Sequence, residues 1–168
     1  MIQSLPFESH LSSLLPDQLM VPDNSVFTFG SNESGRHGAG AALLASQKYG
    51  AKYLQGRGLQ GKSYAIPTKN RERCLRGVTA NLPLNVVQLY VTDFLEFAKV
   101  NPNKNFFVTR VGCGLAGHLD KEMAPMFKGA TENVYFSPQW SAYGYQPWTK
   151  LIVKDAMENG ESIHTDSV

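Results

Sequence analysis

The distribution of glycine constrains this chain most. Eleven of the 15 glycines lie in two windows, residues 30–61 and 112–117. Glycine adopts backbone conformations with positive φ at little cost, so this clustering indicates special loop geometry rather than scattered turns. A run of β-forming residues leads into each window, residues 25–29 into the first and residues 105–111 into the second. We therefore expect two glycine-rich loops that each follow a strand.

The remaining apolar pattern predicts strands that alternate with helices. Strands are expected at 25–29, 63–66, 105–111 and 133–137, and helices at 38–49, 85–100 and 120–129, the last bent near Pro125. The polar residues 69–81 are expected to form a loop. Alternation of this kind is typical of a largely parallel sheet covered by helices, so the predicted fold class is α/β.

The chain has the length and composition of one domain. Its 168 residues are 42% apolar and 18% charged, which allows a buried core without disulfides or metals. We expect a nucleotide-binding domain over residues 25–150. Residues 1–24 are predicted to be an arm packed on that domain, and residues 151–168 a polar C-terminal tail.

Several classes of protein are disfavoured. No stretch approaches the roughly 18 apolar residues of a membrane span, and residues 1–22 lack the pattern of a secretory signal, so a cytoplasmic protein without a membrane partner is expected. Neither Cys74 and Cys113 nor the histidines at 10, 37, 118 and 164 have metal-ligand spacing, so no metal and no cofactor are predicted. A net charge of +2 gives only weak attraction to nucleic acid, and the oligomeric state is open.

Both glycine loops fall where a ligand is expected. In open α/β sheets, ligands bind outside the carboxyl ends of the strands, where the strand-to-helix loops converge. Glycine lets backbone N–H groups approach an anion closely, and the start of a following helix adds a favourable dipole. A diphosphate suits this arrangement best.

Two standard phosphate motifs are matched only weakly. Gly112-x-Gly114-x-x-Gly117 has the spacing of a dinucleotide fingerprint but lacks the acidic residue about 20 positions later. Residues 56–63 fit the spelling of a phosphate-binding loop, yet the β-forming residues 64–66 follow where a helix is required. Neither motif assigns a function by itself.

A longer series of motifs carries a resemblance. It consists of Phe29-Gly30-Ser31-Asn32, residues 35–42, Gly58-Leu59-Gln60-Gly61, Tyr64-Ala65-Ile66-Pro67-Thr68 and residues 108–117. The series resembles the macro-domain superfamily, in particular a branch of small phage and bacterial proteins. That resemblance implies a three-layer α/β/α fold with a central mixed, largely parallel sheet. It also implies a cleft for ADP-ribose or a derivative.

The resemblance assigns roles to both loops. It places Asn32 against the distal ribose, residues 35–40 beside the diphosphate and that ribose, and residues 112–117 around the diphosphate from the other side. The implied ligand-binding residues are Gly30, Ser31, Asn32, Gly35, Arg36, Gly38, Ala39, Gly40, Gly112, Cys113, Gly114, Leu115, Ala116 and Gly117.

The sequence also departs from the family pattern. Arg36 and His37 interrupt the consecutive glycines of classical members, and Ala39 stands where many hydrolytic members carry an acid. The candidate catalytic residues are therefore Asn32, to orient the ribose, and His37 or Glu33, to activate water; imidazole titrates near neutral pH.

Several residues have a plainer alternative. Asn32 could instead close a turn. Cys113 is favoured as a buried residue rather than a nucleophile, because no base is evident for it. Asp120 is interpreted as a helix cap, with an acid–base pair to His118 as the alternative. For the aromatic side chains after the last strand, stacking on the ligand and packing of the tail are equally favoured; they are Tyr135, Phe136, Trp140 and Tyr143.

Three functional hypotheses follow. The first is a protein that binds ADP-ribose or a related NAD-derived nucleotide, with ADP-ribosyl glycohydrolase activity left open. The second is a non-catalytic sink or sensor of a cyclic ADP-ribose signal, of the kind a phage would use against host defence. The third is a module that acts on ADP-ribosylated nucleic acid, for which the charge gives little support.

Overall fold

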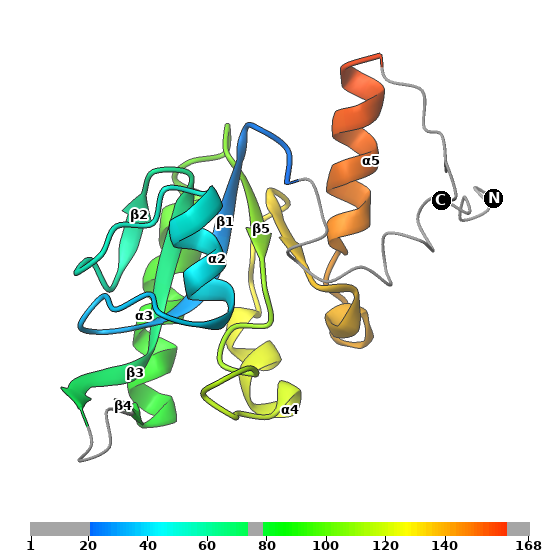
Figure 1. The fold of residues 1–168 in the computed structure, drawn as a ribbon. Helices are drawn as coiled ribbons and strands as arrows, with labels where there is room; N and C mark the ends of the chain where they lie inside the picture. The colour runs from blue at the N-terminus through cyan, green and yellow to red at the C-terminus, as the bar shows by residue number, and fades with distance from the viewer. Residues whose placement is uncertain (1–20, 74–78, 161–168) are drawn as a thin grey trace, which may run out of the picture.

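The computed structural model describes residues 21–73 and 79–160, which fold around one mixed sheet of six strands (Figure 1). The strand order is β2-β3-β1-β5-β6, and β4 pairs with the far part of β3. The parallel strands are β1 (Ser25–Asn32), β3 (Ser63–Arg73), β5 (Asn105–Val108) and β6 (Val134–Phe136). The antiparallel ones are β2 (Gly58–Gln60) and β4 (Thr79–Asn81).

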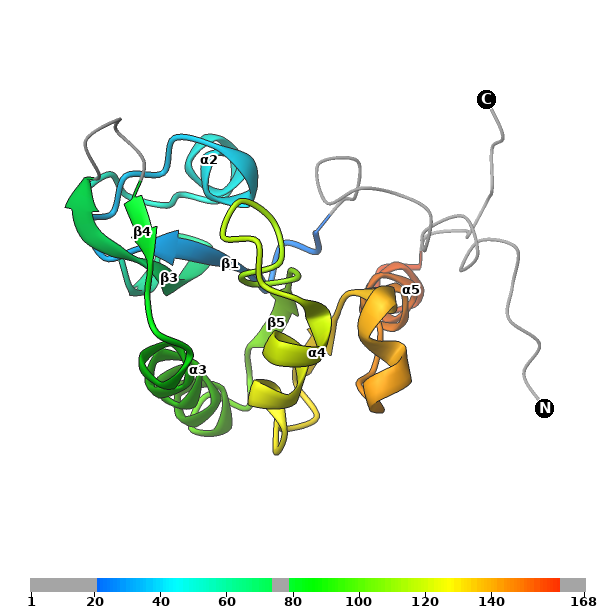
Figure 2. The same cartoon turned by 90° about the horizontal axis from the view of Figure 1, so that it is seen from below.

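Helices cover both faces of the sheet, which gives the predicted three-layer α/β arrangement (Figure 2). On one face lies α2 (Gly40–Lys48), and α5 (Trp148–Glu158) packs beside β6. The other face carries α3 (Leu84–Lys99), α4 (Asp120–Met123), and the 3₁₀ turns η1 (Ala124–Phe127) and η2 (Pro138–Tyr143). No helix in the described ranges is both long and apolar enough to cross a bilayer.

The core divides at the sheet because successive strand residues face opposite sides. Along β1, Val26 faces the α3 layer, whereas Phe27 and Phe29 face α2. Helix α3 buries Val87, Val91, Phe94 and Ala98, a spacing of four, three and four residues. This is the stripe on which the sequence prediction of a helix at 85–100 rests, and the helix is confirmed.

Two elements differ from the sequence prediction. Strand β3 continues past Pro67 to Arg73, and β4 follows, where a loop was expected at 69–81. Proline is tolerated because β2 pairs with β3 only as far as Ala65, so that side of β3 has no ladder to interrupt at residue 67. The extension is instead held by pairing with β1, as in the Ser31–Pro67 pair.

The predicted polar tail at 151–168 is wrong over its first part. Helix α5 runs through the boundary expected at residue 150, and Leu151 and Ala156 are buried. Trp148 anchors the helix: its ring stacks on Phe107 with centroids 4.4 Å apart, and its Nε1 donates to the carbonyl of Val108 at 2.7 Å. Most of the expected N-terminal arm, residues 1–20, and the chain end at 161–168 lie outside the described residues.

Candidate functional site

The two glycine loops meet at the carboxyl edge of the sheet. Strands β1 and β5 are parallel neighbours, so the loops that follow them start side by side. A Cβ atom placed on Gly30 would lie 3.3 Å from the amide nitrogen of Gly112, and one on Gly40 would lie 3.5 Å from the Leu115 side chain. Figure 2 looks onto this edge, with the lime loop after β5 close to α2. The fold thus brings together both segments that the sequence singled out.

The second loop, residues 112–117, presents backbone amides. It closes on itself through two hydrogen bonds, from the amide of Gly117 to the carbonyl of Gly114 and from the amide of His118 to the carbonyl of Gly112, both at 2.9 Å. Within the described chain, the amides of Gly114, Leu115 and Ala116 have no acceptor. Gly114 and Leu115 are exposed, so their N–H groups remain available to an anion, whereas Ala116 is buried.

The start of α2 adds a second set of amides. Its N-cap, Ala39, has no side chain that could accept a hydrogen bond, and the first turn holds no acidic residue. The first helical bond runs from the amide of Leu43 to the carbonyl of Ala39, so the amides of residues 40–42 precede the helical ladder. The positive end of the helix dipole is thus neutralised neither by a cap nor by a carboxylate.

Asn32 closes the first loop on itself. Its Oδ1 accepts from the amide of Arg36 and from the hydroxyl of Ser34, each at 2.8 Å, and its Nδ2 donates to the carbonyl of Arg36 at 2.9 Å. These contacts are the local turn chemistry that asparagine provides. The geometry supports the turn interpretation of Asn32, whereas contact with a ribose stays a prediction.

His37 is buried inside the first loop region. Its ring packs edge-on against Phe29, with centroids 5.3 Å apart. Its Nε2 lies 3.0 Å from the carbonyl of Gln55 and 3.2 Å from Oε1 of Gln60, and because both are acceptors, Nε2 carries the proton. With only 5% of the residue exposed, this arrangement favours a structural role over the predicted acid–base role.

Glu33 turns to the opposite side of the sheet. Its carboxylate accepts a hydrogen bond of 2.6 Å from the hydroxyl of Tyr90, which lies on α3. His37 packs on Phe29, which belongs to the core on the α2 side. The structure therefore does not bring together the two residues predicted to activate water.

The other predicted residues of the first loop divide into packed and exposed positions. The hydroxyl of Ser31 donates to the carbonyl of Gly56. Gly35 is buried against the backbone of residues 54–55, and Arg36 is half-buried. Gly38, Ala39 and Gly40 are exposed, on the side of the loop that leads into α2.

An ion pair at the base of the second loop was missed by the sequence analysis. Arg110, just before the loop, donates twice to the carboxylate of Asp120, just after it, at 2.9 and 2.6 Å. The same carboxylate accepts from Nε1 of Trp140 at 2.6 Å. The hydrogen bond from Arg110 is the main reason that the pKa of Asp120 falls to about 2.

The predicted role of Asp120 as a helix cap is therefore wrong. Leu119 is the N-cap of α4, and its amide donates to the carboxylate of Glu122 at 3.0 Å. Nor does Asp120 bond to His118 within the described residues. The sequence signal that could have indicated the ion pair is the position of Arg110 just before the glycine loop and of Asp120 just after it.

Cys113 and most of the aromatic residues near the last strand have structural roles. Burial, followed by the charge of Asp120, raises the pKa of the Cys113 thiol to about 12, so the thiol stays protonated near neutral pH. Tyr135, Phe136 and Trp140 are buried in the core, as the packing alternative predicted, and Tyr143 is exposed. In the described ranges, no group of three or more His, Cys, Asp or Glu residues is placed to hold a metal ion.

Comparison with known proteins adds little to this geometry. No family model and no curated protein matches the chain. A solved protein of unknown function from Bacteroides thetaiotaomicron is 18% identical with a TM-score of 0.45, over 67% of this chain and 88% of that one. A second solved protein from the same organism is 16% identical with a TM-score of 0.45, over 71% and 94%. Similarity at this level supports no inference about function.

Proposed function

We propose that this protein binds ADP-ribose or a related NAD-derived nucleotide where the two glycine loops meet. One observation carries the proposal. The amides of residues 114–116 and those at the start of α2 lack acceptors in the described chain, and the two segments are adjacent at Gly40 and Leu115. Converging backbone N–H groups at an uncapped helix start are suited to a diphosphate, whose charge they offset without a cationic side chain.

The choice of ADP-ribose among diphosphates has a second support. The motif series that includes Phe29-Gly30-Ser31-Asn32 and residues 108–117 resembles macro domains, and its two halves lie on the two adjacent loops. In this proposal the diphosphate lies on the amides, and the distal ribose lies toward the end of β1. Asn32 then acts by shaping the loop, since its side chain bonds within residues 32–36.

Binding without turnover is favoured over hydrolysis. His37 is buried and bonded to Gln55 and Gln60, and Glu33 is bonded to Tyr90 on the other side of the sheet. General acid–base catalysis needs a group within hydrogen-bond reach of the attacking water, and neither residue is positioned for that. A sink or sensor for a cyclic ADP-ribose signal is therefore the second candidate function. Action on ADP-ribosylated nucleic acid stays a prediction with no further support.

Calorimetric titration with ADP-ribose, followed by mass spectrometry of the recovered ligand, tests the proposal. We expect saturable binding with one ligand per chain and recovery of intact ADP-ribose. Adenosine, which lacks the diphosphate, should bind far more weakly. Recovery of cleaved product would contradict binding without turnover, and equal affinity for adenosine would contradict the role of the amides.

A further inference from the structure

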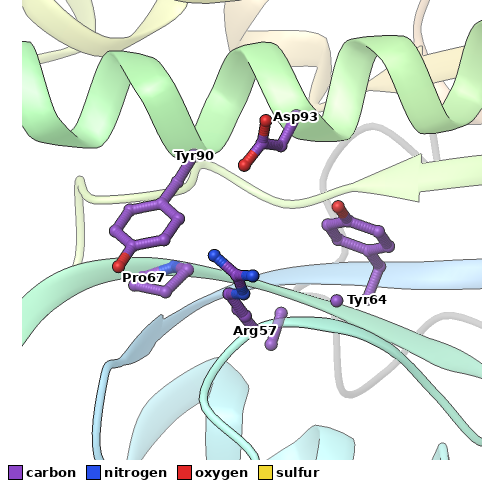
Figure 3. A pocket seen from close by; sticks show the side chains of 7 residues that line it. Arg57, Tyr64, Pro67, Tyr90 and Asp93 are labelled. Carbon is purple, nitrogen blue, oxygen red and sulfur yellow. The ribbon is translucent and has the colours of Figure 1, made fainter.

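A separate pocket lies between β3 and α3, away from the amides of the glycine loops. It has a volume of about 220 Å³, and its walls include Arg57, Tyr64, Pro67, Tyr90 and Asp93 (Figure 3). Arg57 precedes β2, Tyr64 and Pro67 belong to β3, and the other two side chains come from α3. The proposed function makes no use of this pocket.

Rings form much of the pocket wall. The rings of Tyr64, Pro67 and Tyr90 line the space shown in Figure 3. Both phenols are uncharged near neutral pH: burial raises the pKa of Tyr64 from 10 to about 12, and the hydrogen bond to Glu33 raises the pKa of Tyr90. Uncharged walls that contain two aromatic rings favour a planar occupant that can pack against rings.

Two opposite charges face this space without meeting. The guanidinium of Arg57 extends from the sheet side and the carboxylate of Asp93 comes from α3 (Figure 3). Over the described part of the chain, neither side chain forms an ion pair; the observed pair is Arg110 with Asp120. Both residues are exposed, so the two groups are free to meet a ligand that offers the complementary acceptor and donor.

The volume limits what can enter. Pockets for drug-sized ligands usually span roughly 300–1,000 Å³. A space of about 220 Å³ is too small for a dinucleotide and large enough for one ring with a substituent.

We propose that this pocket binds a planar heteroaromatic ring with an exocyclic amide or amino group, whose N–H faces Asp93 and whose acceptor atom faces Arg57. Nicotinamide and adenine share this chemistry. Tyr64, Pro67 and Tyr90 hold the faces and edge of the ring, and the two charged side chains fix its orientation. Binding of the free ring requires nothing from the amides of residues 40–42 and 114–116.

The position of the pocket indicates which part of a substrate would supply the ring. Pro67 pairs with Ser31, and Tyr90 bonds to Glu33, so the pocket wall contacts both chain neighbours of Asn32. If the distal ribose lies at the end of β1, a step that rests on the proposed function, the ring is the group attached to that ribose. The pocket would then distinguish a substituted ADP-ribose from the bare nucleotide.

The first experiment uses the free rings and the isotope-labelled full chain. Nicotinamide and adenine are titrated separately, and backbone amide shifts are followed by NMR. We expect saturable shifts confined to residues 57–67 and 90–93 for at least one ring. Asp93→Asn and Arg57→Gln should each weaken that binding by about fivefold or more. Shifts that do not saturate in the millimolar range, or that lie elsewhere, would overturn the proposal.

Matched controls separate a specific contact from a general loss of charge. Glu96→Gln changes an exposed acid one turn further along α3, and Lys52→Gln changes an exposed cation in the segment before β2. Both controls should bind the rings as the unmodified chain does. If either weakens binding as much as its pocket counterpart, the pocket is not the site.

The second experiment identifies the source of the ring. Affinities for NAD⁺ and ADP-ribose are compared in the unmodified chain and in Asp93→Asn. A loss for NAD⁺ alone indicates the group on the distal ribose, whereas an equal loss for both indicates adenine and overturns the placement beside that ribose. Failure of both nucleotides to bind, with free-ring binding intact, would contradict the proposed function and leave the pocket assignment standing. No effect of Asp93→Asn on any ring or nucleotide would overturn the pocket itself.

Discussion

Gly35 and Gly56 of the first glycine window serve a different purpose from Gly114 and Gly117 of the second. In the first, a Cβ atom added to Gly35 would lie 2.3 Å from the Gln55 amide nitrogen, and one added to Gly56 would lie 2.4 Å from the Asn32 carbonyl oxygen. In the second, Cβ atoms on Gly114 and Gly117 would meet nothing within 4 Å. Gly35 and Gly56 allow two loops to pack backbone against backbone. At these two positions of the second window glycine leaves open space beside exposed amides.

The windows also differ in what holds them. The first is held around His37, whose ring bonds to Gln55 and Gln60. The second is closed at its base by the ion pair of Arg110 and Asp120. We therefore expect substitution of the packed residues Gly35 and His37 to change stability, and substitutions in the second window to change ligand binding and the response to acid.

The largest expected effect is that of Gly35→Ala. The new methyl group would clash with the backbone of residues 54–55, and alanine would have to keep a φ of +74°. Overpacking and left-handed strain together should lower the free energy of unfolding by about 2–4 kcal/mol, measured by urea denaturation. Gly38→Ala is the matched control, because that position is open and its φ is not positive. Equal stability of the two variants would remove the distinction between packed and open glycines.

His37→Ala should have the next largest effect. The substitution removes a buried ring, its packing on Phe29 and two hydrogen-bond contacts, and leaves a cavity. We expect a loss of about 2–3 kcal/mol in urea unfolding, with ADP-ribose affinity reduced only as far as the loop loosens. A variant of unchanged stability that had lost a measurable hydrolase activity would instead make His37 catalytic.

Much of the fold could be predicted because its signals are local. The β-forming run before Gly30 and the apolar stripe of α3 each lie within one element, and both elements are present. The second half of β3 could not be predicted, because its polar residues extend only by pairing with β1 and β4. Helix α5 was missed for a similar reason: its strongest signal is Trp148, whose partners Phe107 and Val108 lie about 40 positions earlier in the chain.

The candidate site shows the same limit. Glycine content and the preceding strands were enough to place both loops at one edge of the sheet. They could not distinguish the packed Gly35 from the open Gly114. Gly35 is packed because residues 54–55 fold back onto the first loop, whereas nothing lies within 4 Å of a Cβ atom on Gly114. The contacts of Glu33 with Tyr90 and of Arg110 with Asp120 likewise join residues that no periodic pattern links.

The open glycine of the second window provides a test of binding. Gly114→Glu adds a carboxylate beside the amides proposed to hold the diphosphate, so ADP-ribose affinity should fall by about tenfold or more. Gly114→Ala should keep most of the affinity, and its stability should stay within about 0.5 kcal/mol of the unmodified chain, since a methyl group there meets nothing within 4 Å. Calorimetry and urea unfolding of both variants give the comparison. Unchanged affinity of the glutamate variant would exclude the second loop from the site.

The smallest expected effect is the loss of stability at low pH that follows from the ion pair of the second window. Since the pKa of Asp120 is lowered from 3.8 to about 2, the carboxylate stabilises the fold above the unfolded pKa, and this contribution is lost as pH falls through the folded value. The contribution should be only about 1 kcal/mol, because 36% and 35% of the Arg110 and Asp120 side chains are exposed to solvent that screens the pair. Asp120→Asn should therefore be destabilised near neutral pH and approach the unmodified chain near pH 2, whereas the control Asp155→Asn on α5 should follow the unmodified chain throughout. Hydrogen exchange locates the effect. The bonded amides of Cys113, Gly117 and His118 should lose protection in Asp120→Asn, whereas those of Glu33, Gly35 and Arg36 should keep theirs. Equal loss in both windows would mean that the ion pair supports the whole edge, and the contrast between the windows would reduce to the packing of their glycines.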